Sequence, residues 1–553
     1  MALRQSWLTG LWAGVALFTF FFALDSQHIP KNGDEYPYEH ITRLTAESGR
    51  LLPLQSALPE MRNTKPPLLF WQGIASTRWG RNWTLWRLRY PSVLYTLATA
   101  LMAGLLASRL SGKVEIGLLA ALDFLAFFST YRYGRPFLTN PPEVFWLFLP
   151  FFVLSYWPGA PGSLVAVPLV LGIAVGIGLL YKSFALALPV ALALSWWHLR
   201  SRGYTFRAFV AKDSPKVAVT LVVALSLFAS WFLLDPDPGA VWSDFVLREN
   251  LGKLDSGTSY FSRLLWGSSS VWSLALAYPL NAGLLAFPVA ALALATWRRR
   301  RELGHAEALL GMWVVSLFVF FSVPSQRSPR YLLPAMPAVA VLLACSAHRI
   351  GRKAYVASLL AAAGALGGIL FLSVAFQNAV PGIRFPAAHW LLLLGTALVI
   401  AMGLGVPRLT PSSVAGATVL VFLSFAFLLR PLDGPIGNYD AETRRYVQDR
   451  DVWVPYDFVA KFEGHHFLLP RARIHGYRED SATAPAALVT RYPLVVLRLP
   501  MGEAPGGSGT ILGRRIDLRG RQSPADFREI LLRGHVQSLL VNEVLVEAQG
   551  SRH

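Results

Sequence analysis

The polar stretch Asn32-Gly33-Asp34-Glu35-Tyr36-Pro37-Tyr38-Glu39-His40 comes after the first long apolar run of the chain, residues 7–24. An apolar run of roughly 18 residues is long enough to cross a bilayer as a helix. The hydrocarbon core does not tolerate exposed irregular polar backbone, so the stretch must lie on one membrane face. It therefore belongs to an extramembrane loop, residues 25–90. The topology of the remaining chain determines which other polar residues lie on the same membrane face.

The composition is that of a membrane protein with many spans. Of the 553 residues, 54% are hydrophobic and 15% are charged, against about 25% charged in an average soluble domain. The net charge of +19 does not indicate nucleic acid, because the basic residues lie in short loops between apolar runs, as the positive-inside rule describes. The one cysteine, Cys345, leaves no intramolecular disulfide and no thiolate metal site. The start of the chain fits either a cleavable signal or, as its length favours, an uncleaved first helix.

Thirteen apolar segments predict a polytopic α-helical membrane protein. They are residues 7–24, 91–108, 115–130, 141–157, 162–180, 184–198, 217–234, 270–296, 306–323, 331–347, 354–375, 388–406 and 412–430. With a cytoplasmic N-terminus, the loops after the even-numbered segments are mostly short and basic, for example 298–301 and 348–353. The loops after the odd-numbered segments then face outside, and so does the tail.

The tail, residues 431–553, is expected to form an extracytoplasmic α/β domain behind a transmembrane domain of residues 1–430. Residues 494–499, 510–518 and 538–546 have the apolar, β-branched composition of strands. Ser523 followed by Pro524 is typical of a helix N-cap and first helical position.

Acids, cations and tyrosines gather in the predicted outside loops. A carboxylate such as that of Asp34 can take a proton from a nucleophile, and Lys or Arg can neutralise a phosphate. At a membrane boundary this combination suits a substrate with a lipid tail and a phosphate head. The plain alternatives are a solvated turn at Asp34-Glu35 and a helix-entry turn at Lys65-Pro66-Pro67. Asp123, inside the third segment, fits either a functional group or a structural partner within the bundle.

The order of these motifs resembles a known family. The pattern Asp34-Glu35, Tyr38-Glu39, Lys65-Pro66-Pro67-Leu68-Leu69-Phe70-Trp71 and Arg87-Leu88-Arg89-Tyr90-Pro91-Ser92 looks like the first extracytoplasmic loop of the GT-C glycosyltransferases. The most similar members are the ArnT-like (aminoarabinose–lipid A transferase) and protein O-mannosyltransferase group. Residues 181–183, 245–250 and 329–337 are similar to further landmarks, so the resemblance covers roughly 1–430.

The resemblance implies a multi-pass glycosyltransferase of the bacterial inner membrane whose site faces the outside. It would transfer a sugar, with inversion, from a polyprenyl-phosphate carrier to a lipid, polysaccharide or protein acceptor. Asp34 matches the catalytic Asp, and Lys65 matches the lysine that holds the carrier phosphate. Arg248 and Tyr331 match positions that help to bind this phosphate, and Arg330 is inferred from its neighbourhood. The other candidates are Glu35 and Glu143 for catalysis, and Tyr38, Arg89, Asn140, Lys182 and Glu249 for substrate binding.

Two positions depart from the pattern of members near the lipid A enzyme. Thr64 replaces an acid before Lys65, and Asn140 stands where many members have Asp. Glu143, one helical turn further on, is expected to take over from Asn140. Both departures weaken the case for a bound divalent metal, so we assign no metal ligand and no certain cofactor. They also weaken the case for lipid A as acceptor.

Two other functions stay open on the sequence alone. A lipid or polysaccharide transporter would have internal repeats and broken helices near the midplane, which the sequence does not show clearly. A non-catalytic, lipid-binding subunit with the GT-C fold would accommodate Thr64 and Asn140. Neither the sugar nor the acceptor is identified by these residues.

Overall fold

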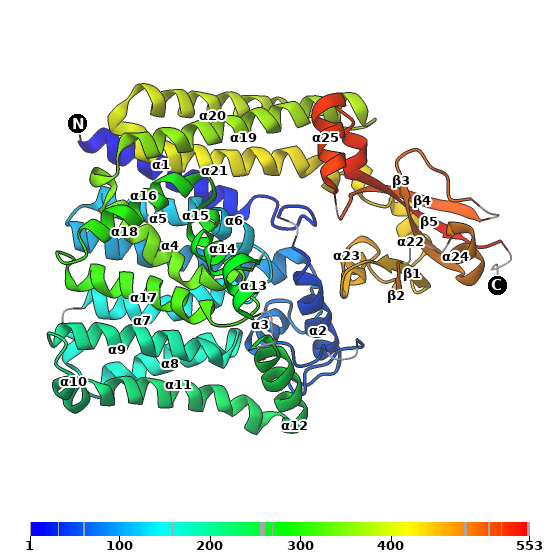
Figure 1. The fold of residues 1–553 in the computed structure, drawn as a ribbon. Helices are drawn as coiled ribbons and strands as arrows, with labels where there is room; N and C mark the ends of the chain where they lie inside the picture. The colour runs from blue at the N-terminus through cyan, green and yellow to red at the C-terminus, as the bar shows by residue number, and fades with distance from the viewer. Residues whose placement is uncertain are drawn as a thin grey trace.

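The computed structural model describes residues 2–549 except 31, 59–60, 158, 255–259, 268, 480–483, 507–508 and 521. Long helices lie side by side in one body, and a small sheet domain packs at one end of it (Figure 1). The helices of this body are α1 (Ala2–Phe21), α4 (Leu85–Ser111), α5 (Val114–Ala126), α6 (Phe128–Gly134), α7 (Asn140–Tyr156), α8 (Ala166–Tyr181), α9 (Ala187–Ser201), α11 (Ser214–Leu234), α15 (Ala277–Ala282), α16 (Ala286–Arg298), α17 (His305–Ser322), α18 (Met336–Cys345), α19 (Arg352–Ala379), α20 (Ala387–Gly405) and α21 (Thr410–Leu429).

The predicted class, a polytopic helical membrane protein, is confirmed. Each of the 13 predicted segments overlaps at least one of these helices. Within the described part of the chain, seven helices are long and apolar enough to cross a membrane, or eight if the bent pair α5–α6 counts as one span. The predicted number is larger because several segments form short helices, such as α8 with 16 residues and α9 with 15.

The centre of the helical body is close-packed. In the most apolar stretch of the segment around α21, 89% of the residues are buried inside the protein. Such burial is typical of a helix surrounded by other helices. At the crossing of α4 and α5, a Cβ on Gly117 would lie 2.6 Å from the carbonyl oxygen of Gly104. Small residues permit such close backbone approach between membrane helices, where dispersion contacts drive association. Asp123 is buried on α5 inside this packing.

The loop after α1 carries two helices outside the bundle, α2 (Glu35–Glu47) and α3 (Leu68–Ser76). Asp34 is the N-cap of α2, so its carboxylate lies at the positive end of the helix dipole. Pro66 and Pro67 precede α3, where proline at a helix start costs no backbone hydrogen bond. Both helices lie at the end of the bundle that faces the sheet domain (Figure 1).

The C-terminal domain is built on a five-stranded mixed sheet in the order β2-β1-β3-β5-β4. The strands are β1 (Asp451–Tyr456), β2 (Arg473–Arg478), β3 (Leu494–Pro500), β4 (Thr510–Leu518) and β5 (Leu540–Glu547). β1 pairs in parallel with β2 and β3, whereas β5 is antiparallel to β3 and β4. The predicted strands correspond to β3, β4 and β5. Ser523 caps α25 (Pro524–Arg533) in a capping box with Asp526, as its sequence predicted. The division of the chain at residue 430 stays a prediction.

Buried polar contacts fasten the first loop to the C-terminal domain. The Glu463 carboxylate accepts hydrogen bonds from His40 Nδ1 at 2.5 Å and from Arg43 Nη2 at 2.7 Å. His40 Nε2 accepts the backbone N–H of Ala57 at 3.0 Å, so Nδ1 is the nitrogen of this imidazole that carries the proton. On the other side of the junction, the ring of His28 lies between Asp433 (3.1 Å) and Asp517 (2.9 Å).

The Glu463 contact predicts acid lability of the junction. Although burial would raise it, the hydrogen bonds from His40 and Arg43 hold the pKa of Glu463 at about 2, below its ordinary value of 4.5. A lowered carboxyl pKa stabilises the folded protein at pH values above the ordinary pKa of this group. This stabilisation is lost as the pH falls toward 2. We expect Glu463 to contribute about 3 kcal/mol near neutral pH, measurable as a fall in melting temperature across this acid window. In a Glu463→Gln variant this part of the pH dependence should vanish; an unchanged pH profile would contradict the assignment.

Candidate functional site

A chain of ion pairs and hydrogen bonds links Asp34 to Lys182 through three intervening side chains. The Asp34 carboxylate forms an ion pair with Arg330 Nη1, and Arg330 Nε donates to Asn140 Oδ1 at 2.9 Å. Asn140 Nδ2 donates to Glu143 Oε2 at 3.0 Å, and Lys182 Nζ contacts the same oxygen at 2.9 Å. These contacts connect the first loop, the 3-10 helix η6 (Pro329–Ala335), the start of α7 and the end of α8. Asn140 therefore connects Arg330 to Glu143, which lies one turn further along the same helix.

Lys65 lies in a second ion pair beside this chain. Its Nζ contacts Glu249 Oε1 at 2.6 Å, which connects the Lys65-Pro66-Pro67 segment to η3 (Trp242–Asn250), a π-helix. Such wide turns are rare and occur often at functional sites. Arg248, the neighbour of Glu249, pairs with Asp244 at 3.2 Å, and its side chain is 42% exposed.

A cavity of about 490 Å³ lies next to these pairs. Charged and polar groups of Lys65, Glu143, Lys182, Glu249 and Tyr331 line one part of it. The remaining wall is apolar and comes from the turn between α8 and α9, from α11 and from the end of α17; it includes Phe184, Leu188, Leu221, Leu225, Phe320 and Phe321. Burial lowers the pKa of Lys182, which lies just beyond α8, while Glu143 opposes this shift. A concave site with apolar walls and a few convergent charges is the usual form of a ligand pocket, and here it suits an amphipathic ligand.

Glu35 and Arg89 lie apart from this cavity, as a fully buried pair. Arg89 donates to both Glu35 oxygens, at 2.8 and 2.7 Å, and also to the backbone carbonyl of Leu24 at 3.1 Å. Glu35 Oε1 additionally accepts the backbone N–H of Phe137 at 2.6 Å. Both side chains are 3% exposed. Contacts of this kind favour a structural role for the pair, which holds α2 against α4, over the catalytic and substrate-binding roles predicted from the sequence.

The Glu35–Arg89 pair predicts a stability effect. Removing one partner of a buried ion pair leaves a buried charge uncompensated and typically costs about 3–5 kcal/mol. We expect Glu35→Gln to lower the free energy of unfolding by about this amount, measured by thermal or denaturant unfolding in detergent. A double variant with Arg89→Met should recover part of the loss. A Glu35→Gln protein that keeps its melting temperature but loses activity would instead support a catalytic role.

The tyrosines predicted for the site lie on two sides of it. Burial raises the pKa of Tyr38, which packs edge-to-face on Phe70 close to Arg330 and Asp34. Tyr331 lines the cavity and stacks on Phe321 with ring centroids 4.9 Å apart. The Arg330 guanidinium lies over the ring of Tyr133, 5.0 Å from its centroid, a cation–π geometry.

Ser183 and Asn250 are polar cavity residues that were not among the predicted site residues. Ser183 Oγ donates to Asn250 Oδ1 at 2.7 Å, and both residues line the cavity. Both lie in segments that resemble the family, residues 181–183 and 245–250, but the resemblance gave neither of them a role in the site. The described residues contain no group of three or more His, Cys, Asp or Glu placed to hold a metal ion. The divalent metal considered from the sequence is assigned no ligands.

Comparison with known proteins finds similar transferases. Residues 32–235 match the family model described as dolichyl-phosphate-mannose-protein mannosyltransferase. The chain is 28% identical over 358 residues to an undecaprenyl phosphate-alpha-4-amino-4-deoxy-L-arabinose arabinosyl transferase of Pseudomonas fluorescens, covering 62% of this chain and 60% of that protein. A transferase of the same name from Erwinia tasmaniensis is 30% identical over 265 residues, covering 46% of this chain and 44% of that protein. The matched regions thus cover less than two thirds of the length of each of these relatives.

The fold is that of a solved membrane protein. The crystal structure of ArnT from Cupriavidus metallidurans bound to undecaprenyl phosphate superposes with a TM-score of 0.60 at 18% identity, over 97% of both chains. The protein is therefore a multi-pass membrane protein with the GT-C fold, and the resemblance predicted from the sequence is confirmed. Within that class its fold is ArnT-like.

Proposed function

We propose that this protein is a glycosyltransferase that takes a sugar from a polyprenyl-phosphate donor. The observation that carries the proposal is the cavity, because its apolar wall suits a prenyl chain and its charged part holds Lys65 and Lys182. The related transferases are named for undecaprenyl phosphate, and the crystal structure of ArnT is a complex with this lipid. By analogy, the donor is an undecaprenyl-phosphate-linked sugar, and 4-amino-4-deoxy-L-arabinose is the first sugar to test.

The proposed reaction is a single displacement at the anomeric carbon. The acceptor oxygen forms a bond to this carbon as its bond to the phosphate oxygen breaks, and polyprenyl phosphate leaves with inversion. A hydroxyl acceptor passes its proton to Asp34; a phosphate acceptor is already ionised, and Asp34 then stabilises positive charge on the sugar. Lys65 and Lys182 stabilise the departing phosphate, with Tyr331 as hydrogen-bond donor. Arg248 would have to leave Asp244 to join them.

The carboxylate partners of these cations have a role in the same proposal. Glu249 and Glu143 neutralise Lys65 and Lys182 in the cavity, and Arg330 neutralises Asp34. A donor phosphate would exchange with Glu249 and Glu143 as the partner of the two lysines. Such an exchange keeps both lysines paired, while Glu143, whose side chain is 2% exposed, keeps its hydrogen bond from Asn140 Nδ2.

We place the protein in the bacterial inner membrane, with the site and the C-terminal domain outside the cytoplasm. This placement follows the basic loops predicted on the opposite face and the bacterial relatives. A lipid, a polysaccharide or a protein remains a candidate acceptor.

The function is tested by comparing envelope glycolipids, polysaccharides and glycoproteins from cells with and without the gene. Mass spectrometry should find one class that loses a sugar in the deletion and regains it on complementation. The purified protein should then transfer that sugar from its undecaprenyl-phosphate donor to the acceptor. An envelope unchanged in every fraction would overturn the proposal. Donor binding without any transfer would point to a lipid-binding subunit.

A further inference from the structure

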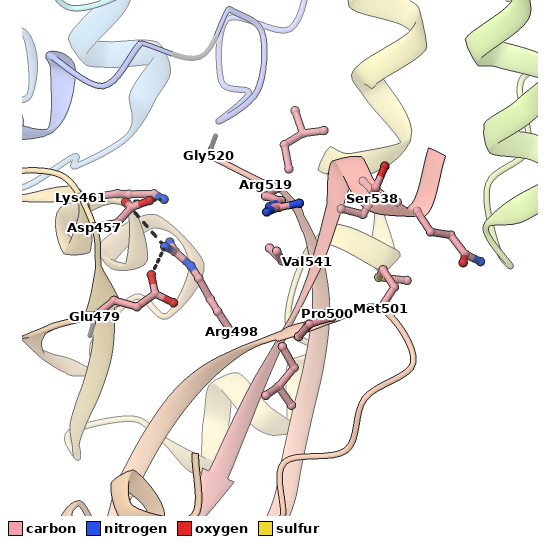
Figure 2. A pocket seen from close by; sticks show the side chains of 14 residues that line it. Asp457, Lys461, Glu479, Arg498, Pro500, Met501, Arg519, Gly520, Ser538 and Val541 are labelled. Carbon is pink, nitrogen blue, oxygen red and sulfur yellow. Dashed lines mark hydrogen bonds and ion pairs between the residues drawn. The ribbon is translucent and has the colours of Figure 1, made fainter. Parts of the chain in front are cut away.

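A second cavity, of about 550 Å³, lies in the C-terminal domain along one edge of its sheet (Figure 2). Four of its lining residues come directly after strands: Asp457 after β1, Glu479 after β2, Met501 after β3 and Arg519 after β4. The start of β5 contributes Leu540 and Val541. The carboxyl ends of all three parallel strands therefore meet at this cavity.

The strand order makes this edge a favourable place for a ligand. From β1 the chain continues to β2 on one side, and β3 then lies on the other side of β1. From β3 the chain continues away from β1, to β4 and β5. The connections after β1 and β3 thus run in opposite directions. In open sheets with parallel strands, ligands bind outside the carboxyl ends at such a switch point.

The polar side of the cavity presents fixed donors and acceptors of both charges. Arg498 Nη1 lies 3.2 Å from Glu479 and 3.7 Å from Asp457, and its Nε contacts Glu543 at 2.9 Å. Lys461 Nζ contacts Asp457 at 3.0 Å. Arg498 is only 8% exposed, so neighbouring groups hold these side chains in place, as Figure 2 shows. The other side is apolar, with Leu499, Pro500, Met501, Leu540 and Val541.

This combination fits a saccharide better than a simple anion. A hydroxyl group both donates and accepts hydrogen bonds, so a sugar can use the carboxylates and the cations of one wall together. The apolar wall can cover the C–H face of the ring. A phosphate would place its charge beside the carboxylates of Asp457 and Glu479, where like charges repel. The volume falls within the range of about 300–1,000 Å³ usual for small-molecule sites.

The cavity also lies close to the proposed reaction site and to the bundle. Phe458, the residue after Asp457, packs so closely on Gly33, the residue before Asp34, that a Cβ there would lie 3.3 Å from its ring. On the other side, Gln537 Nε2 donates to the carbonyl of Ala379 at 3.0 Å, which ties the cavity wall to the last residue of α19. A ligand anchored in the membrane can thus reach the cavity from the bundle.

We propose that this cavity binds the glycan part of a membrane-anchored or envelope saccharide, and that this saccharide is the glycosyl acceptor. That the bound saccharide is the acceptor rests on the proposed function. That the cavity binds a saccharide does not. Asp457, Glu479, Lys461 and Arg519 bind the sugar hydroxyls, and the apolar wall around Met501 packs on the ring.

The test is photo-crosslinking in living cells. A Met501→p-benzoylphenylalanine protein is irradiated in its native envelope, purified and analysed by mass spectrometry for carbohydrate. The matched control carries the same group at Thr490, an exposed residue of α24 (Pro485–Arg491), the helix that leads into the opposite end of β3. We expect a carbohydrate adduct at position 501 that is absent at position 490. Adding Asp457→Asn or, separately, Arg519→Ala should reduce the adduct about tenfold, as expected when one charged hydrogen-bond partner is lost. Unchanged binding of undecaprenyl phosphate shows that each variant is folded.

The outcomes separate this inference from the proposed function, because crosslinking needs no turnover. A carbohydrate adduct in a protein without transfer activity would support the cavity as a saccharide site and count against the transferase. Adducts that contain only peptide or phospholipid, or no adduct, would overturn the saccharide site even if transfer is intact. An adduct equally strong in the Asp457→Asn and Arg519→Ala proteins would overturn it as well.

Discussion

An Asp34→Asn protein should bind undecaprenyl phosphate normally and lose transfer by a factor of about 10²–10⁴, the usual contribution of a general base. Asp34 is the N-cap of α2, and its side chain keeps 39% of its surface exposed although it pairs with Arg330. Its carboxylate is therefore held in place and still reachable. Asparagine keeps the shape and removes the charge and the basicity, so kcat should fall while donor affinity stays. The measurement is transfer of radiolabelled sugar together with binding of the lipid carrier.

Glu39→Gln is the matched control for this variant. Glu39 lies on the same helix and is 1% exposed. Burial, with the nearby charge of Glu35, raises its pKa well above the ordinary value, which favours the neutral form of this carboxyl. Replacing it by the neutral amide should change transfer little. Equal losses in both variants would show that any change in α2 disturbs the site. Unchanged transfer in Asp34→Asn would rule out Asp34 as the base.

The helical part of the fold was readable from the sequence because hydropathy depends on residues close together in the chain. The C-terminal sheet was readable only in part. β3 and β5 are buried and rich in Val and Leu, so their composition indicates strands. β1 contains Pro455, which argues against an interior strand. β2 is an edge strand with mostly exposed Arg, His and Gly residues, and its sequence resembles a loop.

The site was predictable as a set of residues but not as a set of pairs. The topology argument placed Asp34, Lys65 and Arg330 on one membrane face. The partner of Asp34 lies 296 positions away in the sequence, and no local pattern identifies it. The adjacent acids differ for a similar reason. Asp34 is at the N-cap position of α2 and pairs with Arg330, whereas Glu35, one residue later, is directed into the protein toward Arg89. Only the packing of α2 against α4 separates a candidate base from a structural anchor.

Lys65→Ala should weaken binding of undecaprenyl phosphate by roughly 10²-fold, the loss typical when one partner of a hydrogen-bonded, desolvated charge pair is removed. Lys65 is 16% exposed and lines the cavity beside Lys182, so little water can replace its ammonium group at the phosphate. Both the dissociation constant of the carrier and KM for the donor should rise. Binding of radiolabelled undecaprenyl phosphate in nanodiscs measures the effect.

The ion pair between Lys65 and Glu249 predicts that Glu249→Gln changes the affinity for undecaprenyl phosphate in the opposite direction. The Glu249 carboxylate competes with a donor phosphate for the Lys65 ammonium, which it contacts at 2.6 Å. A neutral amide competes less, so Glu249→Gln should bind undecaprenyl phosphate more tightly than the unmodified protein does. In the Lys65→Ala background the competition is gone, and Glu249→Gln should then have a smaller effect on affinity, a non-additivity that a double-mutant cycle measures. Unchanged affinity in Lys65→Ala, or equal gains from Glu249→Gln in both backgrounds, would show that the phosphate does not bind at Lys65.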